Sequence, residues 1–293
     1  MRAQRARFGT MLPMGVPFWR RRSAANSRPS HAGPRPTVDF STVGAVCDAV
    51  DSDVNREAAG EMSTRGWWTA LPTGTGTFST YSRVEVDALP PIPARLLESL
   101  RWLEDVPSAA LEDSILRADQ AQRVLSPEVV AWLTEQGVPA AHVPECLSAL
   151  AANPGLLAGI RTPTMCFVDL GDKVVTVADS AGGGWLIRWL TDSQAVLSWL
   201  IHITSDGRHR IVVSPALIGY AYEPDAGEPY AVPSHPLTST DLETLSVEEC
   251  AGSLTAFLAR LWLESEAWWA LHGESPATAE VTEYVSTWRK LYP

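Results

Sequence analysis

The sequence predicts an α+β fold: an antiparallel β-sheet meander flanked by helices, with a helical N-terminal half and two C-terminal helices. Two patterns support this class. Apolar residues recur three and four positions apart before residue 157 and again after residue 253. Between residues 165 and 222 they alternate with a period of two, and short turn sequences separate the segments. No helical pattern interrupts this central region, so neighbouring strands are expected to pair antiparallel.

The N-terminal half contains clear helix boundaries. Ser126, Pro127 and Glu128 supply a cap, a proline at the first helical position and an early acid, and Gly137 ends the same helix. The alternating segment 83–87 predicts a strand, and residues 73–82 are expected to form a loop or a short hairpin. The predicted helices cover residues 38–62, 93–103, 126–137 and 143–157.

The central region predicts five or six strands. Gly171-Asp172 is typical of a two-residue hairpin turn between segments 165–170 and 173–178. Asp206-Gly207 predicts a second hairpin that leads into 209–214, and 216–222 predicts one more strand. Equal offset across the second turn sets His202 opposite Ile211 and His209 opposite Thr204, so the two histidines do not face each other. The tryptophans of this region fall into alternating sets: Trp185, Ile187 and Trp189 in one segment, and Leu197, Trp199, Ile201 and Ile203 in the next.

Two helices are predicted at the C-terminal end. Residues 246–249 resemble a capping box, and apolar side chains then repeat at helical spacing from Leu254 to Trp269 until Gly273. Ser275-Pro276 predicts the start of the last helix. Its apolar face is expected to contain Val281, Tyr284, Val285, Trp288 and Leu291.

Charge divides the chain in two. Residues 1–36 contain eight arginines and no acid, whereas the remainder has 15 basic and 34 acidic residues, a net charge of −19. We therefore predict a disordered basic tail over 1–37 and a single domain over 38–293. An acidic domain repels phosphate backbones, which argues against nucleic acid, and it suits a basic protein partner. Solubility alone is the alternative explanation of the charge.

The four cysteines indicate reduced thiols. Cys47, Cys146, Cys166 and Cys250 lie far apart without a C-x-x-C pair, so they match neither a zinc site nor a disulfide framework. The charge-free stretches are too short for a membrane span, and no secretory signal is recognised at the N-terminus. The sequence therefore predicts a cytoplasmic protein without a membrane anchor.

No catalytic, metal or cofactor site is predicted. Gly182-Gly183-Gly184 lacks the lysine of a phosphate loop and precedes a strand, which favours a tight bend. None of the six histidines has a second ligand at metal-binding spacing. Glu264 and Glu266 are two positions apart and cannot share one helix face.

Two segments together resemble the SUKH superfamily, the Smi/Knr-type immunity and cell-wall-regulator domains. The first is 178–186, Ala-Asp-Ser-Ala-Gly-Gly-Gly-Trp-Leu, followed by a strand that ends Leu200-Ile201-His202. The second is 257–268, Phe-Leu-Ala-Arg-Leu-Trp-Leu-Glu-Ser-Glu-Ala-Trp, which is similar to a tryptophan-rich helix near the end of many bacterial members. The resemblance covers roughly residues 165–272 and implies an α+β domain whose sheet presents a binding surface.

This resemblance implies a bacterial protein-binding module. Many relatives are immunity proteins that neutralise a toxin, often a nuclease, by direct binding. The expected partner is therefore another protein with a basic toxin domain. The chain itself is not expected to be an enzyme. Two alternatives stay open: a regulatory or scaffold domain of the same fold, and a hydrolase or transferase with an unrecognised site. The residues expected to bind the partner, at an exposed or cleft surface, are Asp179, Trp185, Trp189, Trp199 and Glu264.

Overall fold

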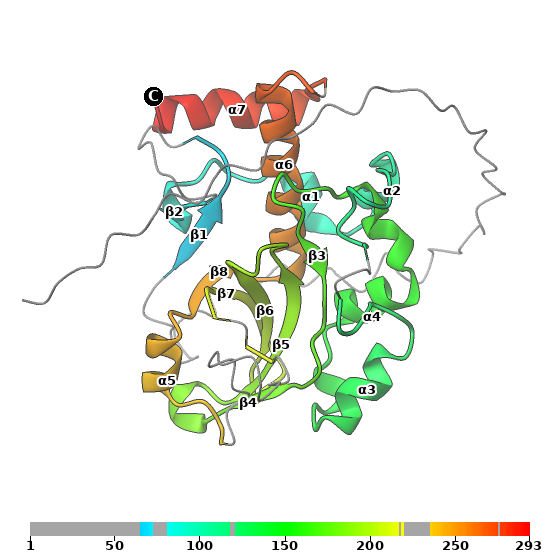
Figure 1. Cartoon of the computed structure of the whole chain (residues 1–293), viewed down its shortest axis with the longest axis vertical. Helices are drawn as coiled ribbons and strands as arrows, with labels where there is room; N and C mark the ends of the chain where they lie inside the picture. The colour runs from blue at the N-terminus through cyan, green and yellow to red at the C-terminus, as the bar shows by residue number, and fades with distance from the viewer. Residues whose placement is uncertain (1–64, 73–80, 118–120, 217, 220–234, 275) are drawn as a thin grey trace, which may run out of the picture. The chain divides into compact units, whose positions relative to one another are not determined.

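The computed structural model describes residues 65–72, 81–117, 121–216, 218–219, 235–274 and 276–293. The chain divides into two compact units, residues 1–39 and 40–293, and every described residue belongs to the second. The predicted tail over 1–37 and the predicted helix over 38–62 lie outside the described residues. Within the second unit the fold is α+β with antiparallel sheets, as predicted (Figure 1).

The described part contains eight strands and seven α-helices. The strands are β1 (Gly66–Thr69), β2 (Ser82–Glu85), β3 (Phe167–Val168), β4 (Val175–Val177), β5 (Gly184–Thr191), β6 (Ser198–Ile203), β7 (His209–Ser214) and β8 (Glu248–Ala251). The helices are α1 (Ala94–Glu98), α2 (Trp102–Asp105), α3 (Val129–Glu135), α4 (Glu145–Ala152), α5 (Ser239–Thr244), α6 (Leu254–Leu271) and α7 (Ala279–Leu291).

The main sheet has six strands and is buried on both faces. Its order is β3-β5-β6-β7-β8, with β4 also paired to β5, and every pairing is antiparallel. Leu197, Trp199, Ile201 and Ile203 belong to one core cluster together with residues of α3, α4 and α6. Leu200 and Val212 belong to a second cluster with Leu242 of α5. Figure 1 shows α5 on the other side of the sheet from α3 and α4.

The predicted hairpin at Gly171-Asp172 is wrong. β3 and β4 do not pair with each other, because each pairs with a different end of β5: Phe167 lies opposite Thr191, and Val175 lies opposite Leu186. The intervening segment is held by Asp169, whose carboxylate forms a fully buried ion pair with Arg188 of β5 at 2.8 Å. This long-range pair draws the segment onto β5 instead of letting it close a two-residue turn.

The predicted hairpin at Asp206-Gly207 is confirmed, but its register is shifted by one residue. His202 lies opposite Arg210, and Ile203 lies opposite His209. The loop has three residues, since Thr204 N–H donates to the Arg208 carbonyl at 2.8 Å, and Gly207 takes the left-handed conformation with φ of 87°. An odd loop length changes the equal-offset register that the sequence suggested.

The strand beside β7 is β8, and two predictions fail there. Ala216, Ile218 and Gly219 form a bend and a turn, while the rest of the expected strand lies outside the described residues. Glu248–Ala251 was expected at the start of a helix, yet it is the edge strand. Ser246 has φ of 51°, so the backbone cannot continue into a helix at that point. The capping box of this region lies earlier, between Thr238 and Asp241 of α5.

The helices follow the predicted patterns with changed boundaries. The helix expected over 93–103 is two short helices, α1 and α2, because Ser99 is extended between them. α3 and α4 lie within their predicted ranges. α6 begins at Leu254, where the Ser253 hydroxyl accepts the Ala256 N–H, and α7 begins after a similar cap at Thr278. Figure 1 shows α7 crossing the C-terminal end of α6.

Candidate functional site

A small pocket lies where β1, β6, the loop 162–166 and α6 meet. Its walls are mainly aromatic and apolar, and its polar side chains come from the loop and from α6. Apolar pockets with a few convergent polar groups are the usual form of small-ligand sites. The aromatic lining consists of Trp67, Trp68, Tyr81 and Trp199, and the acid is Glu264.

The aromatic walls are fixed by packing within the main core. Trp67 lies 5.7 Å from the Phe257 ring and Trp199 lies 6.3 Å from it, measured between ring centroids. Tyr81 meets Trp199 edge-on at 6.0 Å.

Glu264 closes the pocket on the side of α6. Its Oε2 accepts the Trp67 indole N–H at 2.8 Å, and its Oε1 accepts the Tyr284 hydroxyl at 2.9 Å. Burial raises the pKa of Glu264, and the charge of Arg260 and these hydrogen bonds oppose that shift. The carboxylate therefore joins β1 and α7 to α6 while one side of it faces the pocket.

The opposite wall contains a tyrosine, a threonine and a thiol. The Tyr81 hydroxyl donates to the Asp192 carboxylate at 2.8 Å and lies 2.6 Å from Thr164 Oγ1. Burial raises the pKa of Tyr81 well above its usual value and also raises the pKa of the Cys166 thiol. Cys166 is consequently held as a neutral thiol, which is a weak nucleophile.

The structure brings together two of the five residues expected to bind a partner. Trp199 and Glu264 both line the pocket. Trp189 is fully buried in the main core, next to a register shift between Arg188 and Leu190. Trp185 is half-buried beside His142, and Asp179 is exposed in a short 3-10 helix. These five residues therefore do not form one continuous surface.

Sequence reasoning missed the other walls of the pocket. Trp67 and Trp68 form a doublet, and Tyr81 lies within the loop or short hairpin predicted over 73–82, so none of the three carried a binding motif. The only available signal was two adjacent tryptophans next to Gly66. Their neighbour in space, Glu264, is 197 positions from Trp67 along the chain.

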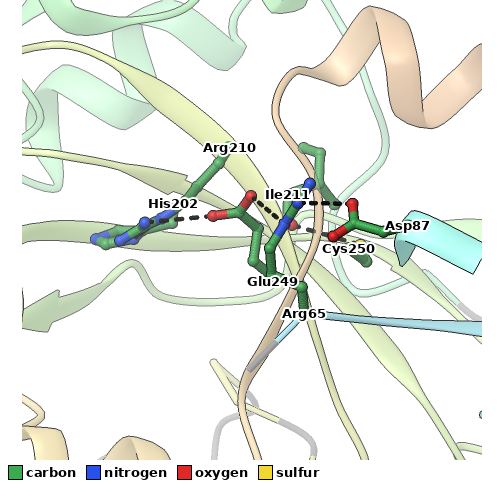
Figure 2. A network of polar contacts seen from close by, with 7 residues as sticks. All are labelled: Arg65, Asp87, His202, Arg210, Ile211, Glu249 and Cys250. Carbon is green, nitrogen blue, oxygen red and sulfur yellow. Dashed lines mark hydrogen bonds and ion pairs between the residues drawn. The ribbon is translucent and has the colours of Figure 1, made fainter. Parts of the chain in front are cut away.

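A second polar network crosses the edge of the sheet and is drawn in Figure 2. Asp87 pairs with Arg65 at 3.0 Å, and Arg65 pairs with Glu249 of β8 at 3.4 Å. Glu249 also pairs with Arg210 at 3.4 Å, and Arg210 Nε donates to His202 Nδ1 at 3.2 Å. The network connects the small β1–β2 sheet to the hairpin of β6 and β7.

His202 is held in its neutral form within this network. Its Nε2 donates to the Gly183 carbonyl at 2.9 Å, while its Nδ1 accepts from Arg210. Protonation would therefore place an Nδ1–H donor next to the positively charged guanidinium of Arg210. Burial and the charge of Arg210 lower the pKa of His202 to about 4. An unfolded chain binds this proton near pH 6.5. The folded state therefore loses stability as the pH falls from about 6.5 through 4.

We expect His202→Gln to remove this pH dependence, because glutamine can keep both hydrogen bonds and does not titrate. From about pH 7.5 to about pH 5 the wild-type chain should lose about 2 kcal/mol more free energy of unfolding than the variant. Urea unfolding at both pH values measures the difference. Equal losses in the two proteins would contradict a neutral His202.

The described residues contain neither a metal-binding cluster nor a membrane-spanning helix. No group of three or more His, Cys, Asp or Glu residues within the described ranges is arranged to hold a metal ion. Among the helices that the structure describes, none is both long enough and apolar enough to cross a membrane.

Comparison with known proteins returns no relative. No protein-family model matches the chain, no curated protein matches it, and no solved structure matches it. The fold and the site define an α+β protein with an aromatic pocket bounded by a buried carboxylate.

Proposed function

We propose that this chain is a protein-binding module of the immunity type, which neutralises a toxin by binding a basic surface on it. The observation that carries the proposal is a stretch of the chain, on and after α1 and α2, that contains five exposed acidic residues. We call this stretch the acidic segment. Its five acidic residues are Glu98, Glu104, Asp105, Glu112 and Asp113.

The acidic segment itself contains little basic charge. Between its first and last acid the chain has one basic residue, Arg101, which is also exposed. Exposed charges of one sign attract an oppositely charged partner and raise the association rate. A toxin that grips nucleic acid needs a cationic surface, so it would match this segment.

Buried anchors hold the acidic segment in place. Leu96, Leu100 and Leu103 are buried, and the Trp102 ring lies 5.3 Å from the Trp262 ring of α6. The Ala109 N–H donates to the Ala158 carbonyl at 3.0 Å, which ties the loop to the helices behind it. A surface held in this way presents its charges without a large ordering cost on binding.

The resemblance to the SUKH superfamily supports the same proposal from a different direction. The glycine-rich motif leads into β5, and the tryptophan-rich motif forms most of α6. Trp262 of that motif packs against Trp102 beside the acidic segment. Trp262, one of the residues that carry the resemblance, therefore supports the surface that we propose for binding.

The test is co-expression of the chain with a basic toxin domain encoded beside its gene. Rescue of growth is expected, together with a complex whose affinity falls steeply as salt is raised. Glu104→Lys/Asp105→Lys should weaken the complex at least about tenfold, mainly through slower association. The matched control is Glu135→Lys/Glu283→Lys, which makes the same charge change at exposed positions outside the segment.

The outcomes separate the candidate functions. Equal affinities for the two double variants would exclude the acidic segment as the binding surface. Absence of both rescue and binding would contradict the immunity role. A stable complex with a partner that has no toxic activity would favour a regulatory or scaffold domain of the same fold.

A further inference from the structure

The pocket lined by Glu264, which we call the Glu264 pocket, contains acidic but no basic side chains in its lining. Among the side chains that line it, Glu264 is an acid and none is lysine, arginine or histidine. The carboxylate is 7% exposed, so water screens it weakly. A ligand that enters this pocket therefore meets the carboxylate of Glu264, and Arg260, whose charge also acts on that carboxylate, lies outside the lining.

The aromatic walls also favour a cation. Trp67, Trp68, Tyr81 and Trp199 surround the space beside the carboxylate. Aromatic rings attract cations through their negative faces, and clusters of such rings recognise quaternary ammonium groups. A combination of several rings with one carboxylate is thus suited to a large, weakly hydrated cation.

The neighbouring Arg260 shows that this cluster stabilises positive charge. Its guanidinium carbon lies 5.9 Å from the centre of the Trp67 ring, within the range of a cation–π contact. Its Nη1 donates to the Tyr284 hydroxyl at 3.0 Å and to the Pro90 carbonyl at 3.1 Å. Because Arg260 makes these contacts outside the lining, it does not occupy the pocket.

We propose that the Glu264 pocket binds an organic cation, an alkylated ammonium or a guanidinium group. The lining has only one carboxylate, which disfavours small, strongly hydrated metal cations. The cation comes either from a small molecule or from a side chain of a protein, and both have the same chemistry.

The test uses the full chain and three probes. Choline represents the small molecule, N-acetyl-trimethyllysine amide represents the protein side chain, and 3,3-dimethyl-1-butanol is the neutral isostere of choline. Calorimetric titration at constant ionic strength is expected to show saturable binding of at least one cation. The neutral isostere should bind at least about tenfold more weakly, because it lacks the charge that the carboxylate attracts.

Variants locate the binding. Glu264→Gln keeps the volume of the side chain and one of its two acceptor oxygens, and it should lower cation affinity at least about tenfold without changing the affinity of the isostere. Trp68→Leu removes the ring of a half-buried tryptophan that lines the pocket and should also lower the affinity for the cation. The matched control is Trp185→Leu, another half-buried tryptophan, which does not line the pocket and should leave affinity unchanged.

Each outcome decides the proposal. Preference for choline over the peptide cation points to a small-molecule ligand, and the reverse points to a protein side chain. Absence of saturable binding by both cations would overturn the proposal, as would equal binding of choline and its isostere. Trp68→Leu keeps the test decisive if Glu264→Gln does not fold, since unchanged cation affinity in that variant would also refute the site.

Discussion

Asp169→Ala is expected to lower the free energy of unfolding by about 3–5 kcal/mol. Asp169 and Arg188 are both fully buried, and their ion pair has an N–O distance of 2.8 Å. The other carboxylate oxygen accepts backbone N–H groups from Gln122, Arg123 and Gly171 at 3.0 to 3.1 Å. Removal of the carboxylate leaves a buried guanidinium without its counter-ion and frees three donors. Chemical denaturation of the purified variant measures the loss.

Two controls identify the cause of that loss. Asp87→Ala breaks the ion pair with Arg65, in which the Asp87 side chain is 84% exposed, and should cost about 0–1 kcal/mol. Asp169→Ala/Arg188→Met removes both charges and should recover part of the stability that the single variant loses. If Asp169→Ala behaves like Asp87→Ala, the buried pair does not hold β3 and β4 against β5.

Gly184→Ala is expected to cost about 4 kcal/mol, through a clash and a strained backbone together. A Cβ at this position would lie 2.0 Å from the Ile203 carbonyl oxygen and 2.8 Å from Thr204 Cα. Both atoms belong to the main chain and cannot rotate away. The residue also has φ of 100°, a backbone conformation that residues other than glycine rarely adopt. Thermal and urea unfolding report the effect.

Two other glycines separate the clash from the strain. Gly273 has φ of 73°, and a Cβ added there would meet no atom within 4 Å, so alanine at this position should cost only about 1 kcal/mol. Gly252 has neither a positive φ nor a close neighbour, and Gly252→Ala should change stability by less than about 0.5 kcal/mol. A loss at Gly184 no larger than at Gly273 would mean that β6 moves to accept the methyl group.

Both proposals involve α6 but use different surfaces of the molecule. Glu264 of α6 faces the pocket, while Trp262 packs against Trp102 behind the acidic segment. The charge-reversal variants and the pocket variants therefore test independent residues. A chain that loses one kind of binding and keeps the other would show that the two sites act separately.

The sequence alone predicted the features that depend on local interactions. Alternation of apolar residues predicted β5, β6 and β7, and the spacing of tryptophans and leucines predicted α6. The turn at Asp206-Gly207 and the helix end at Gly137 followed from residues that adopt positive φ. Each of these signals arises between residues close in the chain, where steric and hydrogen-bonding preferences act directly.

The tertiary structure decided the pairing of strand edges and the composition of the site. Asp169 and Arg188 place β3 and β4 on one strand, and β8 fills the edge that the sequence had assigned to 216–222. The pocket arises because Trp67 meets Glu264 across 197 positions. Buried ion pairs and ring contacts between distant segments depend on the packing of the whole domain, so periodicity and local motifs do not predict them.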